Sequence, residues 1–106
     1  MKTSQIAAAA VLAGAIVLTF AVMSACSRPT DGAGLFQAEG CVKCHAYRGT
    51  GSGIIDLSDV TSYREDEWIH NQIMDPKRND PNSGMPSFGH LTEAEVSAII
   101  QFLHSK

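Results

Sequence analysis

The chain has 106 residues, of which 44% are hydrophobic, with three cysteines, four histidines and a formal net charge of -3. This length allows one ordinary domain. The lack of a basic stripe in the sequence argues against nucleic-acid binding, and the odd number of cysteines excludes a framework in which every cysteine pairs within the chain.

The hydrophobic residues are concentrated at the N-terminus, where 18 of the first 25 residues are apolar, against about 36% from Cys26 onward. A small domain with so few apolar side chains usually needs a disulfide, a metal, a cofactor or a partner to complete its core. We therefore expect a group other than side chains to fill the centre of the fold.

Residues 1–25 have the features of an export signal, a positive start followed by an uncharged apolar stretch over residues 6–25. This stretch is also long enough to cross a bilayer once. The following Cys26 completes the sequence Met23-Ser24-Ala25-Cys26, which resembles the lipobox of bacterial lipoproteins, with Met23 where leucine is usual. We expect a lipid on Cys26, with an uncleaved membrane helix or ordinary secretion as alternatives. All three place the domain outside the cytoplasm, on the periplasmic side of a bacterial envelope.

Residues 26–33 are polar and rich in turn formers, and they are predicted to be a linker to a domain over residues 34–106. The first helix of that domain is expected over residues 34–39, with Leu35 and Phe36 facing inward. Gly40 ends this helix directly before the first of two closely spaced cysteines.

The segment Cys41-Val42-Lys43-Cys44-His45 is the most informative part of the sequence. Two cysteines at this spacing can each form a thioether with one vinyl group of a single haem, and the adjacent histidine then lies beneath the iron as an axial ligand. A structural zinc site would need about four ligands, and the sequence has no second pair to supply them. A thioredoxin-like dithiol would lie beside a βαβ pattern, which the sequence also lacks. The segment therefore predicts one covalent haem c.

A second helix is expected to begin near Ser62, whose spacing to Glu65 is that of a capping box, and to end before Pro76. Three glycines between residues 49 and 53 mark a loop ahead of it, and no segment shows the alternation typical of a strand. The inward-facing residues of this helix are expected to be Trp68, Ile69 and Ile73.

A low-spin electron carrier needs a second axial ligand, and Met85 is the leading candidate. Gly84 permits a close backbone approach, and Pro86 fixes the loop and holds Met85 extended. The other candidates are Met74, at the end of a helix, and the three remaining histidines. His70 is expected within a helix, where it pairs with an acidic neighbour or reaches the haem edge. His90 and His104 are expected to be solvated.

The last helix has the clearest local signals. Thr92 and Glu95 form a predicted capping box, and the apolar residues that follow recur at helical spacing. The buried face of this helix is expected to consist of Val96, Ile99, Ile100 and Leu103.

Residues 34–106 resemble the small bacterial mono-haem members of the class I cytochrome c family. The residues that carry the resemblance are Leu35-Phe36, Gly40-Cys41, Cys44-His45, Ser83, Met85-Pro86, Phe88 and the final helix with Phe102. The resemblance implies an all-α fold of about three helices around one covalent haem c, with His45 as proximal and Met85 as distal ligand. It also implies that the first and last helices cross, so that Leu35 or Phe36 packs against Ile99, Phe102 or Leu103.

The middle region is similar to haem c domains that occur in or beside membrane respiratory complexes, through Asp56-Leu57, Val60, Glu67-Trp68, Asp75-Pro76 and Pro81. By this resemblance Leu57 lines the haem pocket, while Arg64 and Trp68 face the haem propionates. An exposed cation at a helix start is the alternative for Arg64. The family usually has Gly-Pro-Asp-Leu where Ile54-Ile55-Asp56-Leu57 stands, so the carbonyl of Ile55 replaces that of a proline as the expected acceptor for His45.

The expected function is the transfer of single electrons between a donor and an acceptor protein of an extracytoplasmic respiratory chain, at a membrane complex. Such a carrier is not an enzyme and has no small-molecule substrate. A peroxidase-like enzyme or a haem-based gas binder is the alternative, and both would need an open distal site at the position that Met85 fills.

Overall fold

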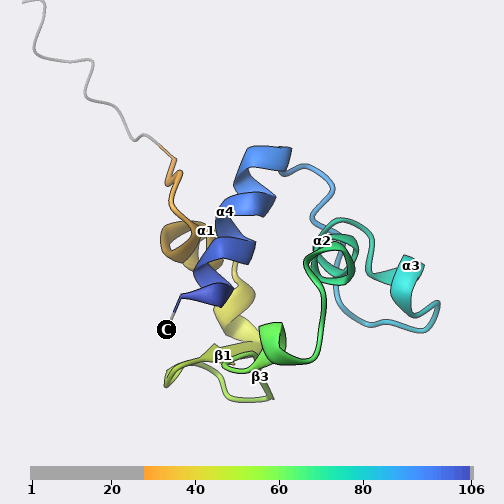
Figure 1. Ribbon diagram of the computed structural model, residues 1–106, viewed down its shortest axis with the longest axis horizontal. Coiled ribbons are helices and arrows are strands. Elements are labelled where there is room, and N and C mark those ends of the chain that lie inside the picture. The colour runs from red at the N-terminus through yellow and green to blue at the C-terminus, as the bar shows by residue number, and fades with distance from the viewer. Residues whose placement is uncertain (1–27, 106) are drawn as a thin grey trace, which may run out of the picture.

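The computed structural model describes residues 28–105 (Figure 1), so the export segment and the expected lipid site at Cys26 lie outside the described residues. The elements, in chain order, are α1 (Gly32–Ala38), the 3-10 turn η1 (Cys41–Lys43), β1 (His45–Tyr47), β2 (Thr50–Gly51), β3 (Ile55–Asp56), the 3-10 turn η2 (Val60–Ser62), α2 (Asp66–Met74), α3 (Pro76–Asn79) and α4 (Glu93–His104). This mostly helical architecture confirms the expected fold class. Within residues 28–105, each helix is too short or too polar to span a bilayer.

The first helix, α1, begins at Gly32, inside the segment expected to be a linker, because Asp31 caps it by accepting a hydrogen bond from the backbone N–H of Gly34 at 2.8 Å. Arg28 forms ion pairs with Glu39 and Glu95. The ordered domain therefore extends back to the start of the described residues.

The expected crossing of the first and last helices is confirmed, and Figure 1 shows α1 beside α4. Gly32 is buried at this crossing, where an added Cβ atom would lie 2.1 Å from the carbonyl oxygen of Ala98. The rings of Phe36 and Phe102 lie 5.5 Å apart in a tilted arrangement. Only a glycine at position 32 allows the two backbones to approach this closely.

A small sheet follows η1, with β1 in the centre, β2 antiparallel to it and β3 parallel to it. The sequence shows no strand alternation because these strands, of two or three residues, are too short to leave such a pattern. Gly51 allows β2 to approach β1, since its φ is +103° and a Cβ there would lie 2.0 Å from the carbonyl oxygen of His45.

The second helix, α2, begins at Asp66 rather than near Ser62, and Ser62 is not its cap. The Ser62 hydroxyl donates to the carbonyl of Asp59 at 2.7 Å, and residues 60–62 form the separate turn η2. Glu65 then adopts an extended conformation ahead of α2. The Ser62 hydroxyl bonds to Asp59 instead of capping α2, so the helix starts later than expected. The expected end of the helix before Pro76 is confirmed.

The last helix, α4, has the expected capping box: the N–H of Glu95 donates to Oγ1 of Thr92 at 3.2 Å, and the N–H of Thr92 donates to Oε2 of Glu95 at 3.4 Å. Its expected inward face is buried. At its other end, the hydroxyl of Tyr47 donates to the carbonyl of Phe102 at 3.0 Å, and their rings lie 4.6 Å apart. The strand β1, which begins at the histidine of the cysteine motif, is thereby fixed to the last turn of α4.

Candidate functional site

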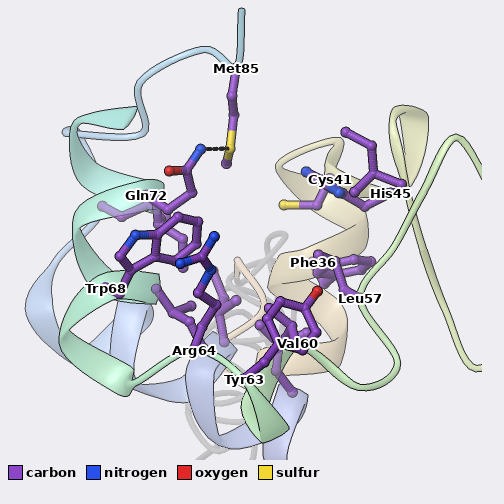
Figure 2. A pocket seen from close by; sticks show the side chains of 16 residues that line it. Phe36, Cys41, His45, Leu57, Val60, Tyr63, Arg64, Trp68, Gln72 and Met85 are labelled. Atoms are coloured by element: carbon purple, nitrogen blue, oxygen red, sulfur yellow. Dashed lines mark hydrogen bonds between the residues drawn. The ribbon is translucent and has the colours of Figure 1, made fainter. Parts of the chain in front are cut away.

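A cavity of about 240 Å³ lies between the Cys41–His45 segment, α2 and the loop that carries Met85. This volume exceeds the space of one or two structural waters, and its walls are mainly apolar. In Figure 2, Cys41 and His45 lie on one wall, Trp68 and Gln72 lie on the facing wall, and the Met85 side chain enters from the loop. The lining residues are Phe36, Cys41, His45, Ile55, Leu57, Val60, Tyr63, Arg64, Trp68, Ile69, Gln72, Ile73, Met85, Leu91, Ile99 and Leu103.

The cysteine segment is shaped by Gly40, whose positive φ of 78° turns the chain from α1 into η1. The N–H of Cys44 donates to the carbonyl of Cys41 at 3.2 Å, which closes this turn. Cys41 is half-buried in the cavity wall, whereas Cys44 is exposed and does not line the cavity. The structure therefore brings Cys41 and His45 to the cavity and places Cys44 outside its lining.

Burial raises the pKa of the Cys41 thiol, and the charge of Glu39 raises it further, against a lowering by the backbone. A thiol with a raised pKa stays neutral near pH 7. Cysteines of redox dithiols instead have lowered pKa values that favour the thiolate. The electrostatics of Cys41 are therefore unlike those of a thioredoxin-type site.

The ring of His45 is half-buried, and burial lowers its pKa, opposed by the backbone of Ile55. A lowered pKa keeps the imidazole neutral, which is the form that binds a metal. Nδ1 of His45 is buried without a hydrogen-bond partner among the described residues. Ile55 pairs with His45 in the sheet, and its backbone, the expected acceptor, is the group that opposes the lowering of the His45 pKa.

The loop around Met85 is fastened to the end of α2. The N–H of Phe88 donates to the carbonyl of Ile73 at 2.9 Å, and the hydroxyl of Ser87 donates to the carbonyl of Met74 at 2.5 Å. These carbonyls lie in the last turn of α2 and have no partner within the helix. Phe88 and Ser87 of the loop supply hydrogen bonds to these two carbonyls, and the two bonds hold Met85 over the cavity.

Sequence reasoning missed Gln72, whose Nε2 donates a hydrogen bond to Sδ of Met85 over 3.5 Å. Gln72 follows the expected inward residue Trp68 by one helical turn, so the i, i+4 spacing places both on one face of α2. That spacing is the signal that could have identified it.

The three residues that the resemblance placed around a haem, Leu57, Arg64 and Trp68, all line the cavity. Leu57 follows a turn in which the Asp56 carboxylate accepts hydrogen bonds from Ser58, and these bonds lower the pKa of Asp56. The Arg64 guanidinium lies 4.1 Å from the centre of the Trp68 ring. Arg64 is thus the one lysine or arginine among the lining residues, and it is held against an aromatic face.

The other ligand candidates do not line the cavity. Met74 is partly buried at the end of α2. Each of the three remaining histidines lies beside a carboxylate of another segment, in the pairs His70–Glu93 at 2.8 Å, His90–Glu39 at 2.8 Å and His104–Asp66 at 2.6 Å. For His70 this is the acidic pairing, one of the two roles expected for it.

The residues around the cavity are suited to binding a haem. The walls are apolar, His45 offers a neutral imidazole with an unpartnered nitrogen, and Met85 offers a thioether, and a haem uses groups of these kinds. Elsewhere in residues 28–105, no three His, Cys, Asp or Glu side chains gather where they could hold a metal ion. Haem is therefore the group to which the lining residues point.

A comparison with protein-family models matches residues 29–106 to the family described as Cytochrome c. No curated protein and no solved structure gives a significant match. Proteins of the matched family bind covalent haem c, and Cys41 and Cys44 have the compatible spacing. The match spans nearly all of the described residues as well as most of the sequence, and the chain therefore belongs to the cytochrome c family.

Proposed function

We propose that this haem-based electron carrier is a mono-haem cytochrome with His45 and Met85 as axial ligands and with Cys41 and Cys44 as the two thioether positions. The observation that carries the proposal is the arrangement of the cavity, in which Met85 enters from a fixed loop while Cys41 and His45 lie on a wall. Haem c, when bound, supplies a one-electron couple between Fe(III) and Fe(II).

The chain's own residues set the conditions for that couple. The thioether of Met85 is a softer and weaker donor to Fe(III) than a second imidazole would be, and an apolar cavity disfavours the extra positive charge of the ferric state. Both effects favour Fe(II) over Fe(III) and raise the reduction potential relative to a bis-histidine haem. Arg64, held against Trp68, offers the positive charge that haem propionates would face. No substrate has to reach the iron.

We test this function with the absorption spectrum and a redox titration of the haem-loaded full chain. The expected result is a six-coordinate, low-spin haem that titrates as one reversible electron and binds CO poorly, since both axial positions are filled. A resting five-coordinate, high-spin haem that binds CO readily would contradict the proposal and favour a gas binder or a peroxidase-like enzyme.

We also propose that the protein is tethered on the periplasmic side of the membrane through a lipid at Cys26. There it would carry electrons between a donor and an acceptor of a membrane respiratory complex. The support lies in the apolar leader and the small residues before Cys26. Mass spectrometry of the mature protein is expected to show an acylated N-terminal Cys26. A mature chain that retains residues 1–25, or one that begins at Cys26 without acyl mass, contradicts the lipid anchor.

A further inference from the structure

Residues 28–31, which precede α1, lie against the domain as an arm that we call the strap. Pro29 packs directly over Gly34, where an added Cβ atom would lie 2.7 Å from Cβ of Pro29. The carboxylate of Asp31 accepts a hydrogen bond from the N–H of the same Gly34 at 2.8 Å and caps α1. Proline restricts its own backbone and that of the residue before it, so the strap has few alternative conformations. The second half of the strap is thus fixed to the first turn of α1.

Arg28 fixes the first half of the strap to the domain. Its Nη2 atom forms an ion pair with Glu39, at the C-terminal end of α1, and a second one at 3.2 Å with Glu95, in the first turn of α4. The two carboxylate side chains are 14% and 21% exposed, whereas that of Arg28 is 48% exposed. Oε2 of Glu39 also lies 2.8 Å from Nε2 of His90, in the loop before α4. An isolated surface ion pair contributes little, but this network joins four segments of the chain and includes two largely buried carboxylates.

We infer that the strap holds the domain on the bilayer surface, with the face around Arg28, Glu39 and Glu95 toward the lipid headgroups. This inference rests on the proposed lipid at Cys26. Only Ser27 lies between Cys26 and the strap, and the two residue steps from Cys26 to Arg28 span at most about 7 Å. A folded domain of this size has a radius of gyration of about 12 Å. Because this leash is shorter than the radius of the domain, the face around Arg28 must stay next to the bilayer.

This orientation leaves the opposite side of the domain open to a partner. In Figure 1, the strap, at the orange start of the coloured ribbon, lies beside α1, whereas α3 lies at the far side of the domain. The loop that carries Met85 connects α3 to α4 and is fastened to the end of α2. The strap therefore turns α3 and the start of this loop away from the lipid, toward the side from which a redox partner can approach.

The test uses the acylated, haem-loaded full chain in phosphatidylcholine vesicles that contain a nickel-chelating lipid. A spin label is attached to Ala38→Cys, next to Glu39, or to Lys77→Cys, on α3, and both positions are exposed. Ni²⁺ at the headgroups is expected to shorten the relaxation time of the label at position 38 several-fold more than that of the label at position 77, because dipolar relaxation falls steeply with distance. Since phosphatidylcholine has no net charge, attraction of Arg28 to anionic lipid cannot produce this difference. Equal relaxation of the two labels in an acylated protein would overturn the inference.

Releasing the strap should remove the difference between the two labels. Arg28→Gln/Pro29→Gly removes the ion pairs of the strap and its packing on α1. The leash then extends over five residue steps, as far as Asp31, and reaches about 18 Å, which lets the domain turn other faces to the bilayer. Most of the difference between the labels is expected to be lost. Arg48→Gln is the matched control: it removes the same charge from an exposed arginine outside the strap, and the difference should stay as in the wild type.

A longer leash on an intact strap gives a second, independent variant. A six-residue Gly/Ser insertion after Ser27 leaves the residues of the strap and their partners unchanged and lengthens the leash to about 29 Å. It is also expected to lose most of the difference. A difference that persists in either variant would overturn the inference. A wild-type chain without acyl mass at Cys26 would instead overturn the proposed anchor, so the two failures are distinguishable.

Discussion

Replacing Met85 with alanine is expected to convert a low-spin haem into a high-spin or substitute-ligated one and to lower its reduction potential. The fall should be on the order of 100 mV, a fraction of the range of about 0.8 V that axial ligands span. The change should be large because the described residues that line the cavity include no other methionine and no histidine besides His45. Absorption spectra of both oxidation states and a redox titration measure it, and covalent haem should be retained.

Met74→Ala is the matched control for this experiment. Met74 stands at the end of α2, is partly buried like Met85 and does not line the cavity. Its loss should lower stability through packing and leave the spectrum and the potential of the folded protein unchanged. If Met85→Ala left the spectrum and potential as in the wild type, Met85 would not be the ligand.

Replacement of the motif cysteines is expected to have the second large effect. Cys41→Ala and Cys44→Ala should each leave at most one thioether, and the double variant should hold no covalent haem. Without the cofactor, the apolar cavity walls lose their filling, at a cost of about 1.5–3 kcal/mol for each large apolar side chain returned to water. Mass spectrometry under denaturing conditions reports the haem bonds, and circular dichroism reports the loss of helical structure.

Cys26→Ala distinguishes the roles of the three cysteines. It should leave the haem mass on the domain unchanged, because Cys26 lies outside the Cys-x-x-Cys-His segment. A double variant of Cys41 and Cys44 that still carries haem mass after denaturation would disprove thioether attachment at these positions.

Local signals in the sequence predicted the parts of the fold that depend on neighbours along the chain. The capping box of Thr92 and Glu95 and the apolar spacing after it defined α4, and the structure confirms both. The same type of signal was misleading at Ser62, because its hydroxyl bonds back to Asp59 instead of capping α2. A capping pattern alone does not reveal such a competing acceptor.

The features that the sequence could not predict depend on contacts between distant segments. The short strands exist because the chain after His45 folds back against the segments around Gly51 and Ile55, and none is long enough to leave a pattern. Gln72 and Asn79 are ordinary helix residues until α3 turns one amide toward the other. Cys44, prominent in the motif, is exposed beside a cavity that Cys41 lines.

The hydrogen bond from Tyr47 to Phe102 joins residues 55 positions apart, and it closes a loop of chain from β1 to α4 that carries most of the cavity-lining residues. Closing a loop of that length costs about 3 to 4 kcal/mol of chain entropy, which one hydrogen bond cannot offset, so the contact forms together with the packing around it. Tyr47 is buried, with 4% of its surface exposed. A truncation that removed the last turn of α4 would leave the Tyr47 hydroxyl without the carbonyl of Phe102 and would release β1, the strand that begins at His45. The last turn of α4 is thus a structural part of the domain that holds the cavity.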